Sequence, residues 1–128
     1  NKKNGMPQDG TVPDDNNWGP IKLSFSGVPE IESTWVGDHL QELTVVDVRE
    51  SYELNNPDQI DSKQTINDSI HIPLHELRDR TGEVPNDKPV VCVCHSGSRS
   101  SMAVNILKKA GYENVANLKG GMLAWVNG

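Results

Sequence analysis

Five short runs of hydrophobic residues, many of them β-branched, predict the strands of one sheet. In the two strongest runs, 43–48 and 89–94, apolar residues follow one another instead of alternating with polar ones. Uninterrupted apolar runs are typical of strands that are buried on both faces of a parallel sheet. The five runs occupy residues 28–31, 43–48, 70–73, 89–94 and 115–118.

The segments between these runs predict helices. The longest helix is predicted over 101–110, with Gly111 as the residue that ends it. Its buried stripe is expected to consist of Met102, Ala103, Ile106, Leu107 and Ala110. Ser33 is predicted as the N-cap of a helix that ends near residue 43. Shorter helices are predicted over 74–77 and 122–126.

Strands and helices in alternation predict an α/β fold with a mainly parallel sheet of about five strands. The first 20 residues contain few core-forming side chains: Met6, Val12 and Trp18 are scattered among polar residues, glycine and proline. Such a stretch lacks the apolar surface that would offset the entropy cost of ordering it. We therefore predict a flexible polar tail or linker over 1–20 and one folded domain over 21–128. The hydrophobic fraction of 34% averages these two parts.

Charge and cysteine usage exclude several kinds of partner. The net charge is −6, from 12 basic and 18 acidic residues, and the basic residues do not cluster, so nucleic acid is not expected as a partner. No run approaches the roughly 20 apolar residues that cross a bilayer, so no membrane partner is expected. Two cysteines separated by one residue give no disulfide framework, which fits a cytoplasmic location. A periplasmic location stays open, because the chain begins at Asn1 instead of Met.

The strongest candidate for chemistry is Cys94, which ends the strand run 89–94. The loop after it, 95–100, is rich in serine and glycine and leads into the longest helix. Such a loop can turn several backbone N–H groups inward, and together with a helix N-terminus these would stabilise a thiolate. Arg99 adds a permanent cation with a planar fork that suits an oxyanion.

Other thiol and imidazole groups are given smaller roles. Cys92 lies inside the strand run and is interpreted as a small buried hydrophobic residue. His95 either tunes the thiolate or lines the entrance to the loop, and the sequence leaves both open. His71 and His75 lack metal-ligand spacing to either cysteine, so no metal is expected.

The segment 94–100, Cys-His-Ser-Gly-Ser-Arg-Ser, resembles the active-site loop of rhodanese-like sulfurtransferase domains, whose pattern is Cys-x-x-Gly-x-Arg-Ser. Three further segments resemble that family in the same order. They are 45–50 (Asp-x-Arg-Glu after a strand), 69–74 (a short strand ending in Ile-Pro-Leu) and 115–125 (Leu-x-Gly-Gly-x-x-Ala-Trp). The resemblance covers residues 28–126.

This resemblance implies a rhodanese-like fold with helices on both faces of the sheet. It also implies a double displacement in which Cys94 takes a sulfane sulfur from thiosulfate or a low-molecular-weight persulfide and passes it to cyanide, a thiol or sulfite. No cofactor is needed. The residues expected to bind the anionic donor are His95, Ser96, Gly97, Ser98, Arg99 and Ser100. Asp47 and Arg49 are expected to form a structural ion pair.

Two alternatives accompany this reading. A related dual-specificity phosphatase would place its arginine six residues after the cysteine, whereas Arg99 comes five residues after Cys94, which favours sulfur transfer. The chain could instead be a sulfur-carrier module that serves a partner protein, including a fused persulfide-oxidising domain. The stretch 63–69 departs from the family's Gly-His-Ile-Pro-Gly-Ala pattern, so the acceptor is not predicted from it.

Overall fold

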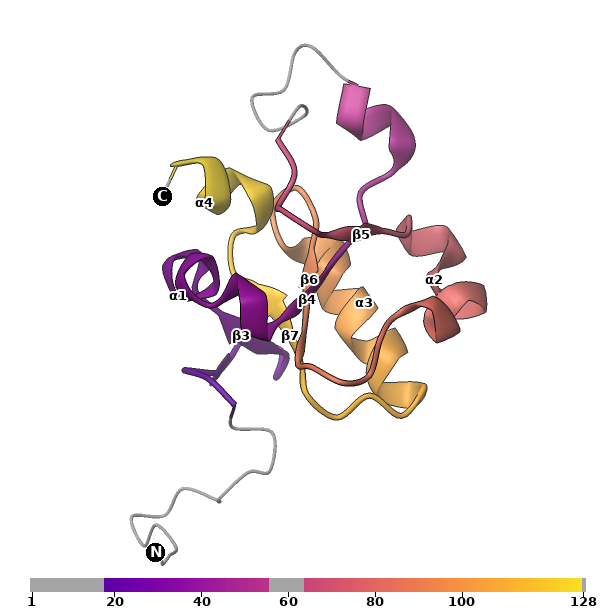
Figure 1. The fold of residues 1–128 in the computed structure, drawn as a ribbon, viewed down its shortest axis with the longest axis horizontal. Coiled ribbons are helices and arrows are strands. Elements are labelled where there is room, and N and C mark those ends of the chain that lie inside the picture. Colours follow the sequence, from indigo (N-terminus) through magenta and orange to yellow (C-terminus); the bar gives the residue numbers. More distant parts are fainter. Residues whose placement is uncertain (1–17, 56–63, 128) are drawn as a thin grey trace, which may run out of the picture.

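The computed structural model describes residues 18–55 and 64–127. Its centre is a six-stranded sheet with the order β2-β3-β7-β6-β4-β5 (Figure 1). Strand β2 pairs antiparallel with β3, and the other neighbouring strands pair in parallel. The strands are β2 (Lys22–Leu23), β3 (Pro29–Ile31), β4 (Thr44–Asp47), β5 (Ile70–His71), β6 (Val90–Val93) and β7 (Val115–Leu118).

Helices cover both faces of the sheet. Helices α1 and α4 lie on one face, and α2 and α3 lie on the other (Figure 1). The helices are α1 (Ser33–Asp38), α2 (Leu74–Arg80), α3 (Ser98–Lys109) and α4 (Gly121–Asn127). Three short 3-10 helices accompany them: η1 (Leu40–Glu42), η2 (Ser51–Asn55) and η3 (Thr81–Glu83). The mainly parallel α/β sheet predicted from the sequence is confirmed.

Alternate residues of β6 serve two separate cores, which explains why its sequence is apolar throughout. Cys92 and Cys94 belong to the core under α2 and α3, whereas Val91 and Val93 belong to the core under α1 and α4. All four residues of the strand are buried. A strand enclosed on both faces has no polar face to give an alternating pattern.

The strand order brings two sequence segments to the same end of the sheet. Strand β6 lies between β4 and β7, and Asp47 at the end of β4 is in register with Val93 at the end of β6. Because these strands are parallel, the residues that follow them leave the sheet at the same edge. In open parallel sheets this is the edge where ligands bind.

Helix α3 differs from its prediction. It begins at Ser98, three residues before the predicted start, because Gly97 adopts a left-handed conformation and serves as the N-cap. Met102 and Ala110, predicted to be buried, are exposed. Ala103 and Leu107 are buried as predicted, Ile106 packs against the same core while partly exposed, and Ser100 and Val104 are the further buried residues of the helix. A hydrophobicity pattern does not reveal Ser100, because a serine is polar and its burial depends on hydrogen bonds described below.

Smaller differences concern the other elements. The predicted helix from Ser33 breaks after Asp38 into α1 and η1, and the N-cap is Glu32, with Ser33 as the first helical residue. Helix α2 continues to Arg80, beyond the predicted 74–77. The sixth strand, β2, was missed because it is exposed and only two residues long.

The N-terminal segment makes one contact that the sequence did not predict. Most of the predicted tail, 1–17, lies outside the described residues. Trp18 packs against Trp35 of α1, with ring centroids 6.2 Å apart. A Cβ atom on Gly19 would lie 3.0 Å from the Trp35 ring, so a larger residue there would require this ring to shift. Trp18 therefore covers the core beneath α1 and α4.

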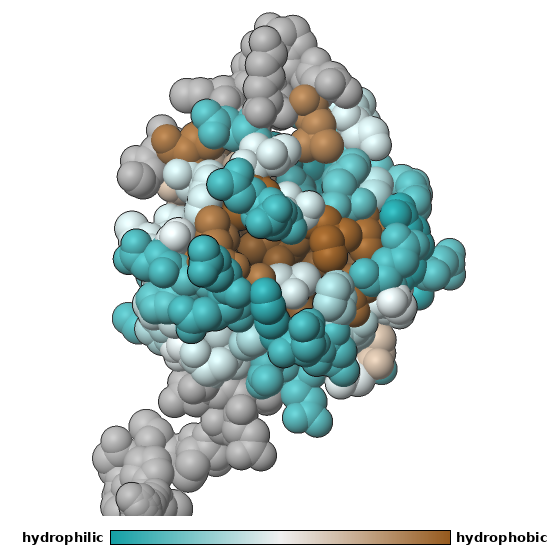
Figure 2. Space-filling view, in the orientation of Figure 1, coloured by the Kyte–Doolittle hydropathy of each residue, from teal (hydrophilic) through white to brown (hydrophobic). Residues whose placement is uncertain are grey.

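Hydrophobic side chains on the face seen in Figure 2 gather in a band across the middle, in the region of β5, with hydrophilic side chains above and below. Strand β5 is an edge strand, and its Ile70 is only partly buried against the core. Among the described residues, no helix has the length and apolar character needed to span a bilayer.

Candidate active site

Cys94 lies at the point where β6 gives way to the loop into α3, and its side chain is fully buried. The backbone N–H of Gly97 donates a hydrogen bond to its Sγ at 3.0 Å, and the Ser100 hydroxyl lies 3.3 Å from the same atom. The loop closes this tightly because Gly97 has φ +105°, a conformation that side-chain-bearing residues rarely adopt. The predicted loop therefore curls around a single sulfur atom.

The first turn of α4 supports this loop. The N–H groups of Met122 and Leu123 donate to the carbonyl oxygens of Cys94 and His95, at 2.8 and 3.1 Å. A Cβ atom on Gly121 would lie 2.5 Å from the Cys94 carbonyl oxygen, so the helix can approach only without a side chain there. These bonds hold two loop carbonyls on the side of α4.

Asn117 of β7 makes hydrogen bonds to Gly97 in the loop and to the first turns of α3. Its Oδ1 accepts a hydrogen bond from the Ser100 hydroxyl, and its Nδ2 donates to the Gly97 carbonyl and to the Ser101 hydroxyl, each at 3.0 Å. Asn117 is 1% exposed, and a buried amide of this kind must have such partners. Asn117 is not among the site residues predicted from the sequence, although a polar side chain inside a buried strand is a signal for it.

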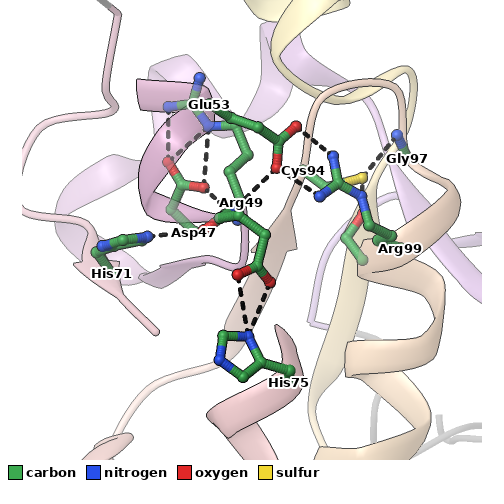
Figure 3. A network of polar contacts seen from close by, with 10 residues as sticks. Asp47, Arg49, Glu53, His71, His75, Cys94, Gly97 and Arg99 are labelled. Atoms are coloured by element: carbon green, nitrogen blue, oxygen red, sulfur yellow. Dashed lines mark hydrogen bonds and ion pairs between the residues drawn. The ribbon is translucent and has the colours of Figure 1, made fainter. Parts of the chain in front are cut away.

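Arg99 forms an ion pair with Glu53 of η2. Its Nη1 and Nη2 donate to the two carboxylate oxygens of Glu53, each at 2.5 Å, and the pair lies beside Cys94 (Figure 3). Glu53 also accepts the backbone N–H of Glu50 at 2.8 Å. The hydrogen bonds from Arg99 lower the pKa of Glu53 below its ordinary value, so this carboxylate is ionised at neutral pH. Glu53 is not among the site residues predicted from the sequence.

Asp47 and Arg49 form the buried ion pair that was expected between them. Nη2 of Arg49 lies 2.7 Å from the Asp47 carboxylate, and both side chains are almost completely enclosed. The same Nη2 donates to the carbonyl oxygen of Gln64 at 2.8 Å. His71 of β5 donates to the Arg49 carbonyl at 2.7 Å (Figure 3). Arg49 thus links Asp47, at the end of β4, to the backbone at Gln64, which lies before β5 in the sequence.

The other candidate residues differ in exposure and in their partners. Ser96 and Ser98 are exposed, whereas His95 and Arg99 are partly buried. Cys92 is fully buried, and burial raises the pKa of its thiol, as expected for an inert core residue. The side chain of His75 is exposed and pairs with Glu50 at 3.0 Å, which raises the pKa of this imidazole. Within 18–55 and 64–127, no three His, Cys, Asp or Glu side chains cluster in a way that could hold a metal ion.

Comparison with known proteins identifies the family. A sequence model of the rhodanese-like domain matches residues 32–128. The chain belongs to the rhodanese-like domain family. This rhodanese-like domain is 35% identical over 101 residues to a sulfurtransferase of Allochromatium vinosum, a match that covers 77% of this chain and 88% of that protein. It is 34% identical over 85 residues to the thiosulfate sulfurtransferase GlpE of Pseudomonas syringae, covering 66% of this chain and 74% of GlpE.

A solved structure shows the same fold. The crystal structure of a rhodanese-related protein from Thermoplasma volcanium superposes on this rhodanese-like domain with a TM-score of 0.67. The two sequences are 32% identical, and the match covers 77% of this chain and 90% of the other. Together with the named sulfurtransferases, this likeness supports a rhodanese-type transferase activity.

Proposed function

We propose that this protein moves a sulfane sulfur from a small anionic donor, thiosulfate or a low-molecular-weight persulfide, to a thiophilic acceptor through a persulfide on Cys94. The observation that carries the proposal is the closure of the 94–100 loop around one sulfur atom. The Gly97 N–H points at Sγ, and the Ser100 hydroxyl lies beside it. Charge-assisted hydrogen bonds of this kind stabilise an anionic sulfur.

The first half-reaction forms one S–S bond and breaks another. The Cys94 thiolate attacks the outer sulfur of the donor, the bond between the donor's two sulfurs breaks, and its electron pair leaves with sulfite or with the donor thiolate. The Gly97 N–H then donates to the anionic sulfur group, and Ser100 adds a hydroxyl. Arg99, whose guanidinium is paired with Glu53, lies beside Cys94.

The second half-reaction regenerates the enzyme. A thiolate, cyanide or sulfite attacks the terminal sulfur of the Cys94 persulfide and carries it away, and the Cys94 thiolate leaves with its electron pair. Both half-reactions are nucleophilic displacements at sulfur, so protein groups alone carry them. The five-residue spacing from Cys94 to Arg99 supports sulfur as the transferred atom over a phosphate ester.

The proposal extends to the setting of the reaction. We place the protein in the cytoplasm, with a thiol as the physiological acceptor or, alternatively, a partner protein or fused domain that receives the sulfur. A fully buried Cys94 requires that the donor displace neighbouring side chains before its outer sulfur reaches Sγ. Small donors and acceptors fit this requirement.

The test is sulfur loading and turnover of the wild-type protein beside Cys94→Ser and Cys92→Ser. With thiosulfate, the intact mass of the wild type should increase by one sulfur atom, and cyanide should then release thiocyanate. Cys94→Ser should do neither, and Cys92→Ser should keep both. Full activity of Cys94→Ser would contradict the proposal. Loading without turnover on any small acceptor would favour the sulfur-carrier alternative, and turnover of a phosphoester alone would favour the phosphatase.

A further inference from the structure

We propose that Glu53 sets the charge of the sulfur donor: by neutralising Arg99 it makes the site select a monoanionic donor with an organic body over the dianion thiosulfate. This inference rests on the proposed sulfur transfer and names its substrate class. It makes Glu53 a specificity-determining residue that acts on the donor through Arg99.

The guanidinium group of Arg99 already has an anionic partner. Both terminal nitrogens of the guanidinium donate to Glu53, one to each carboxylate oxygen, and Glu53 is 7% exposed. This is the bidentate geometry in which arginine also binds oxyanions. A donor that needs the same fork must displace a carboxylate or remain next to it.

Glu53 is itself held in place. Besides Arg99, its Oε1 accepts the backbone N–H of Glu50, and its own backbone N–H donates to the Glu50 carbonyl at 2.9 Å. The Glu53 carboxylate thus binds the backbone at the start of η2 as well as the Arg99 guanidinium. Displacing it would leave a nearly buried negative charge without its strongest partner, a costly outcome at low local dielectric.

Among the described residues of this network, the neighbouring charges add no free cation for the donor. Arg49 is the other arginine in this network, and it is already paired with Asp47 (Figure 3). Glu50, whose backbone N–H binds the Glu53 carboxylate, adds a further carboxylate, which pairs with the exposed His75. Each arginine is already paired with a carboxylate. A dianion that approaches Cys94 brings one more negative charge than a monoanion does, and it is therefore repelled more strongly.

An exposed aromatic ring adjoins Glu53 in the sequence. Tyr52 precedes Glu53 in η2 and is 72% exposed. An exposed aromatic ring offers contact area to an organic group, whereas inorganic thiosulfate has no apolar group to place against it.

Two sulfane donors of different charge give a balanced comparison. With thiosulfate, Cys94 thiolate and the dianion yield the Cys94 persulfide anion and sulfite. With benzenethiosulfonate, a monoanion, the thiolate attacks the terminal sulfur and yields the same persulfide anion and benzenesulfinate. In both cases the bond between the two donor sulfurs breaks, its electrons leave with the sulfur oxyanion, and no outside oxidant or reductant takes part.

The experiment measures the ratio of kcat/KM for thiosulfate to kcat/KM for benzenethiosulfonate. Glu53→Gln keeps a carbonyl oxygen for the Glu50 N–H and removes the charge, and it should raise this ratio about tenfold, as expected for one unit charge at short range in a partly screened site. Glu53→Ala serves as a second neutral variant, and the ratio is measured on whichever keeps the wild-type circular dichroism. Glu53→Asp keeps the charge and should keep the wild-type ratio.

The matched control is Glu83→Gln, which removes a carboxylate from a similar two-bond pair with Arg80 on the surface. It should leave both donors unchanged. A ratio unaltered by loss of the Glu53 charge, or an equal change for both donors, overturns the assignment. If the wild type takes sulfur from neither donor, the proposed function itself fails, which is a separate result.

Discussion

The hydroxyl of Ser100 donates to Oδ1 of Asn117 and also lies 3.3 Å from Sγ of Cys94. One hydroxyl proton cannot serve two acceptors fully, so the amide competes with the sulfur for it. Asn117 also donates to Gly97, whose N–H contacts the sulfur. Asn117 is thus a positioning residue for the two groups that contact Cys94.

Replacing Asn117 should therefore slow sulfur transfer more than it weakens donor binding. Asn117→Ala leaves the Ser100 hydroxyl and the Gly97 carbonyl without this partner, at a cost of about 2 kcal/mol in the free energy of unfolding. We expect kcat for thiocyanate formation to fall about tenfold with little change in KM for the donor, because Asn117 acts on the loop and not on the donor. Asn105→Ala, on the exposed side of α3, is the control. Equal kcat in the two variants would remove Asn117 from this role.

Gly121→Ala tests the support of the loop by α4. Its Cβ would lie 2.5 Å from the Cys94 carbonyl oxygen and 2.6 Å from that of His95, at φ +59°. We expect a loss of about 1–3 kcal/mol in the free energy of unfolding and a strong loss of sulfur uptake. Gly82→Ala is the matched control, because nothing lies within 4 Å of its Cβ. Chemical denaturation and intact mass after thiosulfate treatment provide the measurements.

The buried pair of Asp47 and Arg49 should be worth much more to stability than the surface ion pairs. Arg49→Met leaves the Asp47 carboxylate buried without its partner, which costs about 3–5 kcal/mol. The double variant Asp47→Asn, Arg49→Met should lose less than the sum of the two single variants, because each single change already removes the interaction. Arg80→Met, in an exposed pair, should change stability little. Additive losses measured by urea denaturation would show that the pair is not coupled.

The ion pair of Glu53 and Arg99 should make stability depend on pH in the acid range. Arg99 lowers the pKa of Glu53 in the folded state, so this contribution is fully present above the ordinary carboxylate pKa and disappears as the pH falls through the lowered value. At pH 7 wild type should exceed Glu53→Gln by about 2 kcal/mol in the free energy of unfolding. The difference should shrink toward zero in strong acid. A difference that is constant with pH would show that the Glu53 charge is not its source.

The sheet and the cysteine loop could be predicted from the sequence because local signals define them. Strand β6 is apolar at every position since both of its faces are buried, and the glycine and serines after Cys94 mark the turn into α3. The start of α3 was placed three residues late, because the left-handed conformation of Gly97 allows the helix to begin immediately after it.

The pairing of Glu53 with Arg99 could not be predicted in the same way. The two residues are 46 positions apart, and Glu53 lies in a polar connector with no periodicity. Asn117 gave a weak local signal, a polar residue in an apolar strand, but its partners Gly97 and Ser101 become its neighbours only when β7 docks beside β6. Long-range polar contacts of this kind depend on the assembled sheet.

The strand pair β2–β3 protects β7 from solvent and from other molecules. The family match begins at residue 32, after β3, yet β3 pairs with β7 through Ile31 and Leu118, and Glu30 contacts Asn117. A shortened protein starting at that boundary would leave β7 as a bare edge, with unpaired N–H and C=O groups able to recruit strands from other copies. Removal of Trp18 would uncover Trp35 in the same step. With β3 in place, β7 has a paired neighbour on that side, directly beside Asn117, which holds the active-site loop.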